Sequence, residues 1–170
     1  MDLKQIIRDF PDFPRTGILF RDITTILKDP AYFNSAIVQI EALLEGIDYD
    51  LVISPESRGF MFGAPIASRQ MKGFVPARKK GKLPGDVVRR TYFLEYGLDA
   101  IEIHKDAVKP GQKVVIIDDL LATGGTAKSI CEIVEELGGQ VVCIAFLIEL
   151  CTIKGREILK DYNLQTALQY

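Results

Sequence analysis

The segment that most constrains the fold of this chain lies at residues 114–126. A run of β-branched apolar residues over 114–117 predicts a buried strand that ends in the adjacent acids Asp118 and Asp119. A loop of small residues follows, and a helix is predicted to begin at Thr126. Because the positive end of the helix dipole and its free N–H groups point at this loop, the loop suits a phosphate. Two acids beside a phosphate favour a ligand that also carries hydroxyls or a divalent cation, and a phosphorylated sugar carries the hydroxyls.

Two common phosphate-binding motifs do not fit this loop. A Walker A loop needs a Lys followed by Ser or Thr after its glycines, whereas Gly124-Gly125 is followed by Thr126-Ala127. A dinucleotide fingerprint needs three spaced glycines and a later acid. The alternative is a solvated turn that caps a helix, because Asp and Thr are common cap and loop residues. Either acid alone favours that alternative, but the complete ordered segment favours a ribose-phosphate site.

After residue 30, strand-like and helix-like runs alternate along the chain. Near-continuous apolar strands are typical of a parallel sheet that is covered on both faces. The sequence therefore predicts a single α/β domain with a mainly parallel, twisted sheet flanked by helices. The predicted strands are residues 51–54, 74–77, 114–118 and 141–148, and the predicted helices are residues 31–44, 59–71 and 126–137.

Residues 86–103 break this alternation. They predict two extended arms around a turn at residues 96–99, which is a hairpin that projects from the sheet as a flap. The basic, glycine-rich segment 79–85 precedes the hairpin, and we expect it to be a mobile lid. An ordinary solvated loop is the alternative for Lys79, Lys80 and Lys82, although their place after a strand favours anion binding.

A second candidate anion site is the loop at residues 54–59. It follows a predicted strand and opens a helix, and ligands of open α/β sheets gather at that edge. The amides of residues 57–59 and the fixed charge of Arg58 would suit pyrophosphate, because a guanidinium group matches phosphate oxygens two at a time. On this segment alone, an N-cap with an exposed Arg is an equal alternative.

Composition excludes several classes of partner. The net charge of −2 gives no general attraction to nucleic acids or to anionic membranes. The longest apolar run considered, residues 141–148, is far shorter than the roughly 20 residues that span a bilayer. The N-terminus lacks a hydrophobic signal core, and Cys131, Cys143 and Cys151 lack metal-type spacing. We expect a cytoplasmic protein with reduced, buried cysteines and no membrane or nucleic-acid partner.

The strand, the acidic pair and the Ala-Thr-Gly-Gly-Thr loop resemble the phosphoribosyl pyrophosphate motif of type I phosphoribosyltransferases. The resemblance covers most of the chain, from about Phe10 to Leu150. Within the family it points to the members that act on adenine. The further segments that carry it are Phe10–Pro14, Phe20–Ile23, Glu56–Phe60, Arg78–Gly85 and Leu94–Gly97.

The resemblance implies a fold and a reaction. The fold is a small α/β core with an N-terminal hood at about residues 1–30 and a flexible flap at about residues 79–104, in a homodimer. The reaction is the purine-salvage conversion of adenine and 5-phosphoribosyl 1-pyrophosphate (PRPP) to AMP and pyrophosphate with Mg²⁺. The Mg²⁺ ion would be held mainly through substrate and water, with no residue of the chain as a direct ligand.

The resemblance also implies the site residues. Asp118 and Asp119 would hold the ribose hydroxyls, and the Glu56–Ser57 peptide would be cis. Glu95 would manage the proton on adenine, with an ordinary surface acid as the alternative, whereas the sole histidine, His104, is expected to be structural or solvated. The other implied residues are Ala122, Thr123, Gly124, Gly125 and Thr126 for the 5′ phosphate; Ser57, Arg58, Lys79 and Lys82 for pyrophosphate; and Leu19, Phe20, Arg21, Leu120 and Ala122 for adenine. Arg58 is also implied as catalytic, and an ordinary core position is the alternative for Phe20.

Two other functions compete with this prediction. A phosphoribosyltransferase for hypoxanthine, guanine or xanthine would share the sugar-phosphate site and differ in the hood. A non-catalytic regulator that senses PRPP would be expected to carry a nucleic-acid-binding segment or a basic face, and the sequence has neither. We therefore expect an enzyme.

Overall fold

The computed structural model describes residues 2–93 and 97–170, and the chain divides after Gln39 into two compact units. Unit 1 contains a short 3-10 helix, a two-stranded antiparallel hairpin and the start of a long helix. Leu3, Ile23 and Ile26 are its buried apolar centre. Its elements are η1 (Leu3–Gln5), β1 (Arg8–Pro11), β2 (Leu19–Asp22), α1 (Thr24–Leu27) and α2 (Pro30–Leu43), the last of which continues into unit 2.

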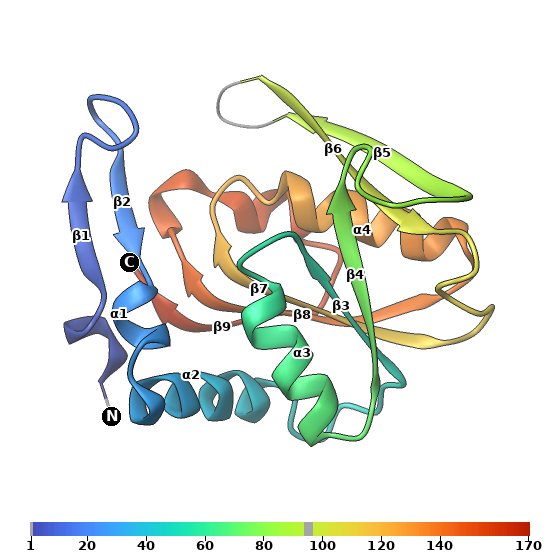
Figure 1. The fold of residues 1–170 in the computed structure, drawn as a ribbon, viewed down its shortest axis with the longest axis horizontal. Helices are drawn as coiled ribbons and strands as arrows, with labels where there is room; N and C mark the ends of the chain where they lie inside the picture. Colours follow the sequence, from blue (N-terminus) through green and yellow to red (C-terminus); the bar gives the residue numbers. More distant parts are fainter. Residues whose placement is uncertain (1, 94–96) are drawn as a thin grey trace. The chain divides into compact units, whose positions relative to one another are not determined.

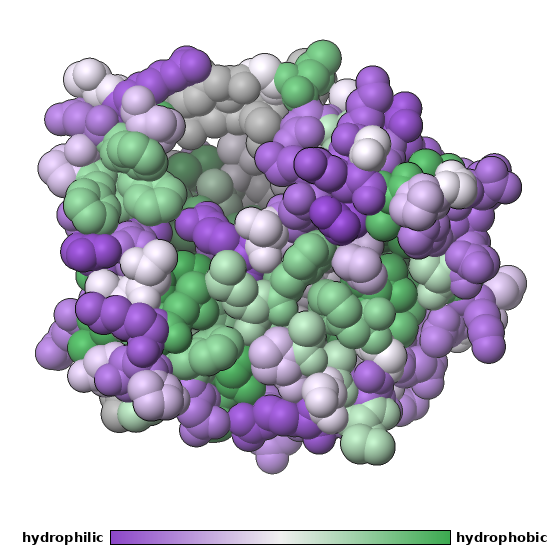
Figure 2. Space-filling model, in the orientation of Figure 1, coloured by the Kyte–Doolittle hydropathy of each residue, from purple (hydrophilic) through white to green (hydrophobic). Residues whose placement is uncertain are grey.

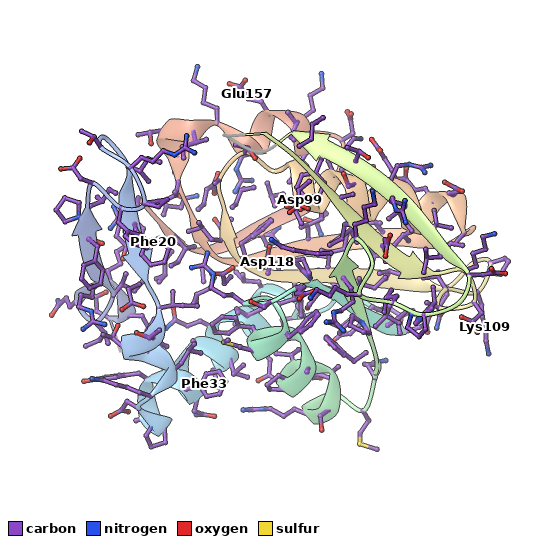
Figure 3. The ribbon with its side chains drawn as sticks, turned by 45° about the horizontal axis from the view of Figure 1, so that its top comes forward. Phe20, Phe33, Asp99, Lys109, Asp118 and Glu157 are labelled. Atoms are coloured by element: carbon purple, nitrogen blue, oxygen red, sulfur yellow. The ribbon has the colours of Figure 1, made fainter. Side chains whose placement is uncertain are left out.

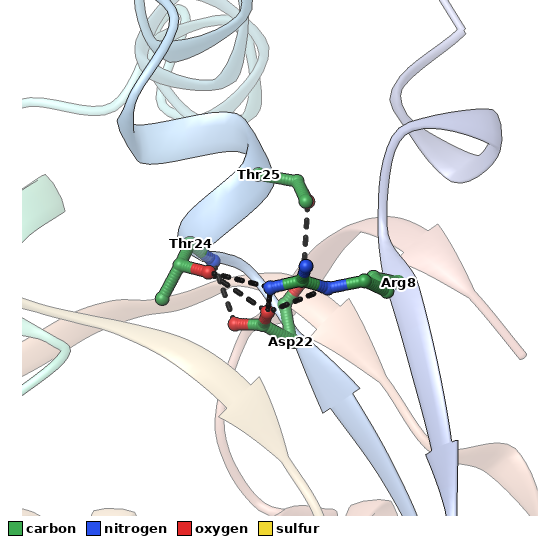
Figure 4. Close-up of polar contacts among 4 residues, drawn as sticks. All are labelled: Arg8, Asp22, Thr24 and Thr25. Carbon is green, nitrogen blue, oxygen red and sulfur yellow. Dashed lines mark hydrogen bonds and ion pairs between the residues drawn. The ribbon is translucent and has the colours of Figure 1, made fainter.

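The buried carboxylate of Asp22 fastens the hairpin of unit 1 (Figure 4). Arg8 donates to it from Nη2 at 2.5 Å and from Nε at 3.1 Å, and Thr24 donates from its backbone N at 2.9 Å. Burial alone would raise the pKa of Asp22, but the hydrogen bonds from Arg8 and Thr24 outweigh it and hold the pKa below its ordinary value. The two strands are thereby tied to the turn that follows them.

Unit 2 is built on a seven-stranded sheet with the order β5-β6-β4-β3-β7-β8-β9 (Figure 1). Five neighbouring strands, from β4 to β9 in this order, run parallel, whereas β6 is antiparallel to both β4 and β5. The mainly parallel α/β fold predicted from the sequence is confirmed. The strands are β3 (Leu51–Pro55), β4 (Gly73–Lys79), β5 (Val87–Phe93), β6 (Leu98–His104), β7 (Lys113–Leu121), β8 (Gln140–Glu149) and β9 (Leu164–Gln169).

Helices cover the sheet because its strands are apolar on both faces. Ile53, Ile116 and Ile144 share a buried cluster with Ile130 and Val134 of helix α4. Since side chains alternate along a strand, the residues directly before and after each of these isoleucines face the other side of the sheet. Helix α3 (Phe60–Arg69) packs against β3, β4 and β7, and α4 (Gly125–Glu136) packs against β5, β6, β7 and β8.

The predicted hairpin is confirmed as strands β5 and β6, whose register pairs Val87 with His104 and Thr91 with Ala100. His104 has a structural contact, because its Nε2 lies 2.9 Å from the carbonyl oxygen of Pro84. Hydrophilic side chains gather over this part of unit 2 (Figure 2). The sequence did not predict β9 or the two short helices before it, η2 (Cys151–Ile153) and η3 (Gly155–Leu159).

The cysteine prediction was right for two of three positions. Cys131 and Cys143 are buried, and burial raises the pKa of the Cys143 thiol to about 11. Cys151 is exposed at the start of η2, so the expectation that it would be buried was wrong. The sequence there has no apolar periodicity that could have placed it. Within residues 2–93 and 97–170, no helix has the length and apolar character needed to cross a bilayer.

Candidate active site

Two loops meet at one edge of the sheet in unit 2. Strands β3 and β7 are adjacent and parallel, with Leu51 opposite Val114 and Ile53 opposite Ile116. Their carboxyl-terminal loops therefore emerge side by side, where ligands of α/β sheets bind. We name residues 56–59 the first loop and residues 122–126 the second loop. The site predicted from sequence combines these two loops.

The acidic pair lies within β7, because that strand continues to Leu121, three residues beyond its predicted end. Asp119 is only 4% exposed, and Asp118, labelled in Figure 3, is partly buried. The Oδ1 atom of Asp118 accepts a hydrogen bond from the backbone N of Asp119 at 2.8 Å. The Oδ2 atom of Asp119 lies 2.9 Å from Nε of Arg58. This ion pair joins the end of β7 to the first loop.

Burial governs the protonation of this pair. It raises the pKa of Asp118 well above its ordinary value, and the neighbouring charge of Asp119 raises it further. Burial also raises the pKa of Asp119, although the Arg58 guanidinium opposes that effect. Burial therefore disfavours the charged form of both acids, and the Arg58 guanidinium favours the charged form of Asp119.

Glycine at position 59 is required by the close packing of the first loop. A Cβ atom there would lie 2.8 Å from Cδ of Pro55 and 2.9 Å from Oδ1 of Asp118, both shorter than ordinary contacts. The Glu56–Ser57 peptide is cis, as the family resemblance implied. Ser57 is exposed, and Arg58 is partly exposed beside Asp119.

The second loop presents the start of α4. Gly124 is the N-cap with φ of 80°, a left-handed conformation that favours glycine, and the helix begins at Gly125, one residue earlier than predicted. The first N–H groups of a helix have no carbonyl partner within it, and the helix dipole is positive there. Beside the loop is a cavity of about 400 Å³ lined by Thr91, Tyr92, Thr123, Gly125, Lys128, Ser129, Glu132 and Ile158. The second loop thus has helix-start N–H groups with no carbonyl partner within the helix and a neighbouring cavity, which are the features that a phosphate cradle would need.

The predicted pyrophosphate lysines lie on the other side of β3. Lys79 is the last residue of β4, and its Nζ lies 3.4 Å from Oδ2 of Asp99 on the flap strand β6. Lys82 is exposed, and its backbone N donates to the carbonyl oxygen of Lys79 at 3.2 Å. Glu56 holds this segment in place, a role that the sequence did not predict. Its Oε2 accepts from Nε of Arg78 at 2.9 Å and from the backbone N of Lys79 at 3.1 Å.

Glu56 thereby joins the first loop to the basic segment. The hydrogen bond from Arg78 is the main cause that lowers the pKa of Glu56, so the carboxylate stays ionised. A carboxylate 22 residues before its arginine partner forms no local pattern, and no signal in the sequence marks the pair. Hence Arg58, Lys79 and Lys82 all belong to segments that ion pairs with acids hold in place.

The predicted adenine residues are divided between the units. Leu19, Phe20 and Arg21 lie on β2 of unit 1, where Phe20 packs edge-to-face on Phe13 with ring centroids 5.2 Å apart. Arg21 donates from Nη1 to both carboxylate oxygens of Asp9 at 2.9 Å. Leu120 and Ala122 are partly buried in unit 2. Glu95, the predicted proton carrier, lies outside the described residues.

The acids present fit Mg²⁺ held through a substrate. In the described part of the chain, no group of three or more His, Cys, Asp or Glu side chains is arranged to bind a metal ion. Mg²⁺ commonly keeps several waters and binds through one or two carboxylates together with substrate phosphates. Asp118 and Asp119 are two such carboxylates, and with no third acid grouped with them in the described residues, the ion would be held mainly through substrate and water.

Comparison with known proteins defines the class of this fold and site. Residues 24–166 match the phosphoribosyl transferase domain family. The chain is 52% identical to an adenine phosphoribosyltransferase of Lachnoclostridium phytofermentans over 168 residues, which are 99% of this chain and 97% of that protein. It is 53% identical over 171 residues to the enzyme of the same name from Ruminiclostridium cellulolyticum, with complete coverage of both chains.

Solved structures similar to this chain belong to the same class of enzyme. The crystal structure of adenine phosphoribosyltransferase from Thermoanaerobacter pseudethanolicus has a TM-score of 0.97 and 51% identity, covering 99% of this chain and 98% of that one. The Saccharomyces cerevisiae enzyme, complexed with an imino-altritol bisphosphate and adenine, has a TM-score of 0.93 and 40% identity, covering 98% and 96%. The fold and the site define a phosphoribosyltransferase. The chain belongs to the phosphoribosyl transferase family and, within it, to the adenine phosphoribosyltransferases.

Proposed function

We propose that this enzyme uses the two loops at the sheet edge to hold PRPP while adenine displaces its pyrophosphate. The reaction forms AMP and pyrophosphate and belongs to purine salvage. The observation that carries this proposal is the arrangement of the buried pair Asp118 and Asp119 directly before a glycine-capped helix start, with Arg58 within 2.9 Å of Asp119. One edge of the sheet thereby offers acceptors for hydroxyls, donors for a phosphate and a cation for pyrophosphate.

The sugar phosphate is held at two points. In our proposal, Asp118 and Asp119 accept hydrogen bonds from the ribose 2′ and 3′ hydroxyls, and the amides and hydroxyls of residues 122–126 bind the 5′ phosphate. Charge-assisted hydrogen bonds of this kind are about twice as strong as neutral ones. Holding the ribose at both ends fixes the position of C1, and correct placement of reactants lowers the barrier.

In our proposal, the pyrophosphate is held mainly by cations, and Arg58 and Lys79 exchange their acid partners for it. Ser57, Arg58, Lys79 and Lys82 are its proposed ligands, and Arg58 is also catalytic because it stabilises the charge that develops on the leaving group. Mg²⁺ supplies further charge neutralisation when it is bound with PRPP. The C1–O bond breaks as a ring nitrogen of adenine bonds to C1, and pyrophosphate leaves with the electron pair.

Adenine would be read by the backbone of Leu19 and Arg21, with Phe20 on one face of the ring and Leu120 and Ala122 on the other. Backbone N–H and C=O groups can read the edge of a base whatever the side chains are. Glu95 is our proposed acceptor of the adenine proton. We further propose a hood at residues 1–30, a flap at residues 79–104, a homodimer and a cytoplasmic location.

The test is the purified protein with PRPP and Mg²⁺ and each purine base in turn, with the nucleotide identified by chromatography. We expect AMP from adenine and at least a hundredfold lower rates with hypoxanthine, guanine and xanthine. A site that pairs with the amino edge of adenine leaves buried polar groups unpaired with an oxo purine. Formation of IMP, GMP or XMP at the AMP rate would overturn the choice of adenine as the base. If no nucleotide forms with any of the bases, the proposed catalytic activity is overturned.

A further inference from the structure

The turn at residues 154–158, which we name the η3 turn, lies directly behind the second loop. Gly155 is buried there. A Cβ atom on Gly155 would lie 2.0 Å from the carbonyl oxygen of Ala122 and 3.0 Å from the carbonyl carbon of Thr123. In return, a Cβ atom on Gly124 would lie 2.8 Å from the carbonyl oxygen of Gly155. The two backbones are in contact, with no space for a side chain on either.

The η3 turn is itself fixed to the sheet. Glu149, only 4% exposed, accepts from Nε of Arg156 at 2.9 Å and from Nη2 at 2.7 Å. Nη1 of Arg156 donates to the carbonyl oxygen of Leu164 on β9 at 3.2 Å. The backbone N of Leu150 donates at 2.9 Å to the carbonyl oxygen of Leu121, the residue before the second loop. The turn is therefore bound to β8 and β9 through Arg156, and the residue that follows β8 is bound to β7.

The η3 turn also shapes the space beside the second loop. The Ile158 side chain would be 3.1 Å from a Cβ atom on Gly124, and it lines the cavity of about 400 Å³ together with Thr123 and Gly125. A loop of Ala, Thr and Gly has little side-chain packing of its own and high backbone entropy. Its conformation must therefore be fixed from outside.

We propose that Gly155 and the Arg156–Glu149 pair are positioning residues for the 5′-phosphate site. This inference rests on the proposed function and adds to it the part of the chain that holds the phosphate loop in its binding conformation. Backbone donors bind a phosphate well only when held within about 0.5 Å of the correct geometry. The η3 turn meets this requirement by backbone contact, which only glycine at position 155 permits. Any ligand with a ribose 5′-phosphate depends on it, whereas free adenine does not.

Gly155→Ala is the direct test. The φ of Gly155 is not positive, so alanine suits its backbone and the change acts through the contact with Ala122. We expect the KM for PRPP and the Kd for AMP and ribose 5-phosphate each to rise about tenfold or more, because small displacements of positioning groups are costly. The KM for adenine should stay within about twofold. Steady-state kinetics and calorimetric titration measure these values.

Two controls separate positioning from stability. Gly139→Ala places a Cβ atom 2.6 Å from Cγ1 of Val108 at the far end of α4, so it destabilises the fold without touching the second loop. Glu157→Gln changes the same turn at a side chain that is 71% exposed and points outward (Figure 3). Both controls should retain the wild-type KM for PRPP. Equal increases for Gly139→Ala and Gly155→Ala would overturn the inference.

Arg156 gives a second, milder test in case Gly155→Ala does not fold. Arg156→Lys keeps the charge but loses the two parallel hydrogen bonds to Glu149, so the KM for PRPP should rise less than with Arg156→Ala. Wild-type values for both variants, or a matching rise in the KM for adenine, would overturn the positioning role while the wild-type enzyme still makes AMP. A wild-type protein that makes no AMP would overturn the proposed function and this inference with it.

Discussion

The first and second loops lie at the same sheet edge but are built by different means. The first loop carries a charged side chain, Arg58, that already has a partner in Asp119 at 2.9 Å. The second loop offers backbone groups at the start of α4 and rests on the backbone of Gly155. We infer that the 5′-phosphate end of the site is formed before substrate arrives, whereas the pyrophosphate end forms when Arg58 changes partners.

In our proposal, this difference gives the two ends of PRPP separate energetic roles. Binding to the second loop needs little rearrangement, so its affinity is used directly. Binding to the first loop breaks an ion pair with a buried acid, and that acid is left to accept the ribose hydroxyls. Under this proposal, pyrophosphate recognition is therefore coupled to ribose recognition through Arg58 and Asp119, and recognition of the 5′ phosphate is independent of them.

The largest effect should come from Asp119→Asn. The change removes a buried charge that pairs with Arg58 and, in our proposal, accepts from ribose, and hydrogen bonds to charged groups contribute about 1.5–3 kcal/mol each. We expect PRPP affinity to fall about a hundredfold and adenine affinity to stay within about twofold. Calorimetric titration with each ligand measures both. Equal losses for the two ligands would contradict the ribose role of Asp119.

Arg58→Gln should separate the two loops. The variant loses the cation for pyrophosphate, so PRPP affinity should fall about tenfold, by roughly 1.4 kcal/mol. Ribose 5-phosphate has no pyrophosphate, and its affinity should change less than about twofold because Asp119 is freed at the same time. Competition between the two ligands measures the ratio. A parallel loss for both would show that Arg58 holds the ribose end, against the division between the loops.

Asp118→Asn should stabilise the protein while weakening PRPP binding. Burial raises the folded-state pKa of Asp118, so the unfolded chain ionises first and the acid lowers stability as pH rises above its ordinary value of 3.8. Asparagine removes this cost and can still accept from the backbone N of Asp119. We expect a gain on the order of 1–2 kcal/mol at pH 7 that vanishes near pH 3, measured by urea unfolding. A loss of stability at pH 7 would contradict it.

Local patterns in the sequence were sufficient for the second loop, because the apolar run, the acidic pair and Gly124 are contiguous. The fold class followed from the alternation of strand-like and helix-like runs, and the β5–β6 hairpin followed from the break in that alternation. The supporting contacts did not, since they join distant residues: Glu56 with Arg78, and Ala122 with Gly155. Strand β9 was missed because its polar residues do not alternate with a clear apolar face. Contiguous patterns thus predict local elements such as a strand, a loop and a helix start better than they predict contacts between distant residues.

The smallest effect concerns the support of the second loop at low pH. The hydrogen bonds from Arg156 hold the pKa of Glu149 below its ordinary value of 4.5, in opposition to burial. The stability from this pair is therefore complete above pH 4.5 and is lost as pH falls through the lowered folded value. We expect Glu149→Gln to cost about 0.5–1 kcal/mol at pH 7, a modest amount because Arg156 is largely exposed.

Below pH 4.5 the difference between Glu149→Gln and wild type should shrink toward zero in urea titrations. Thr166→Val is the matched control, since it removes one neutral donor to Glu149 and leaves the ion pair intact. Its cost should change less with pH than that of Glu149→Gln. A pH-independent difference for Glu149→Gln would show that the charge of Glu149 does not support the η3 turn, and the second loop would then depend on backbone contact at Gly155 alone.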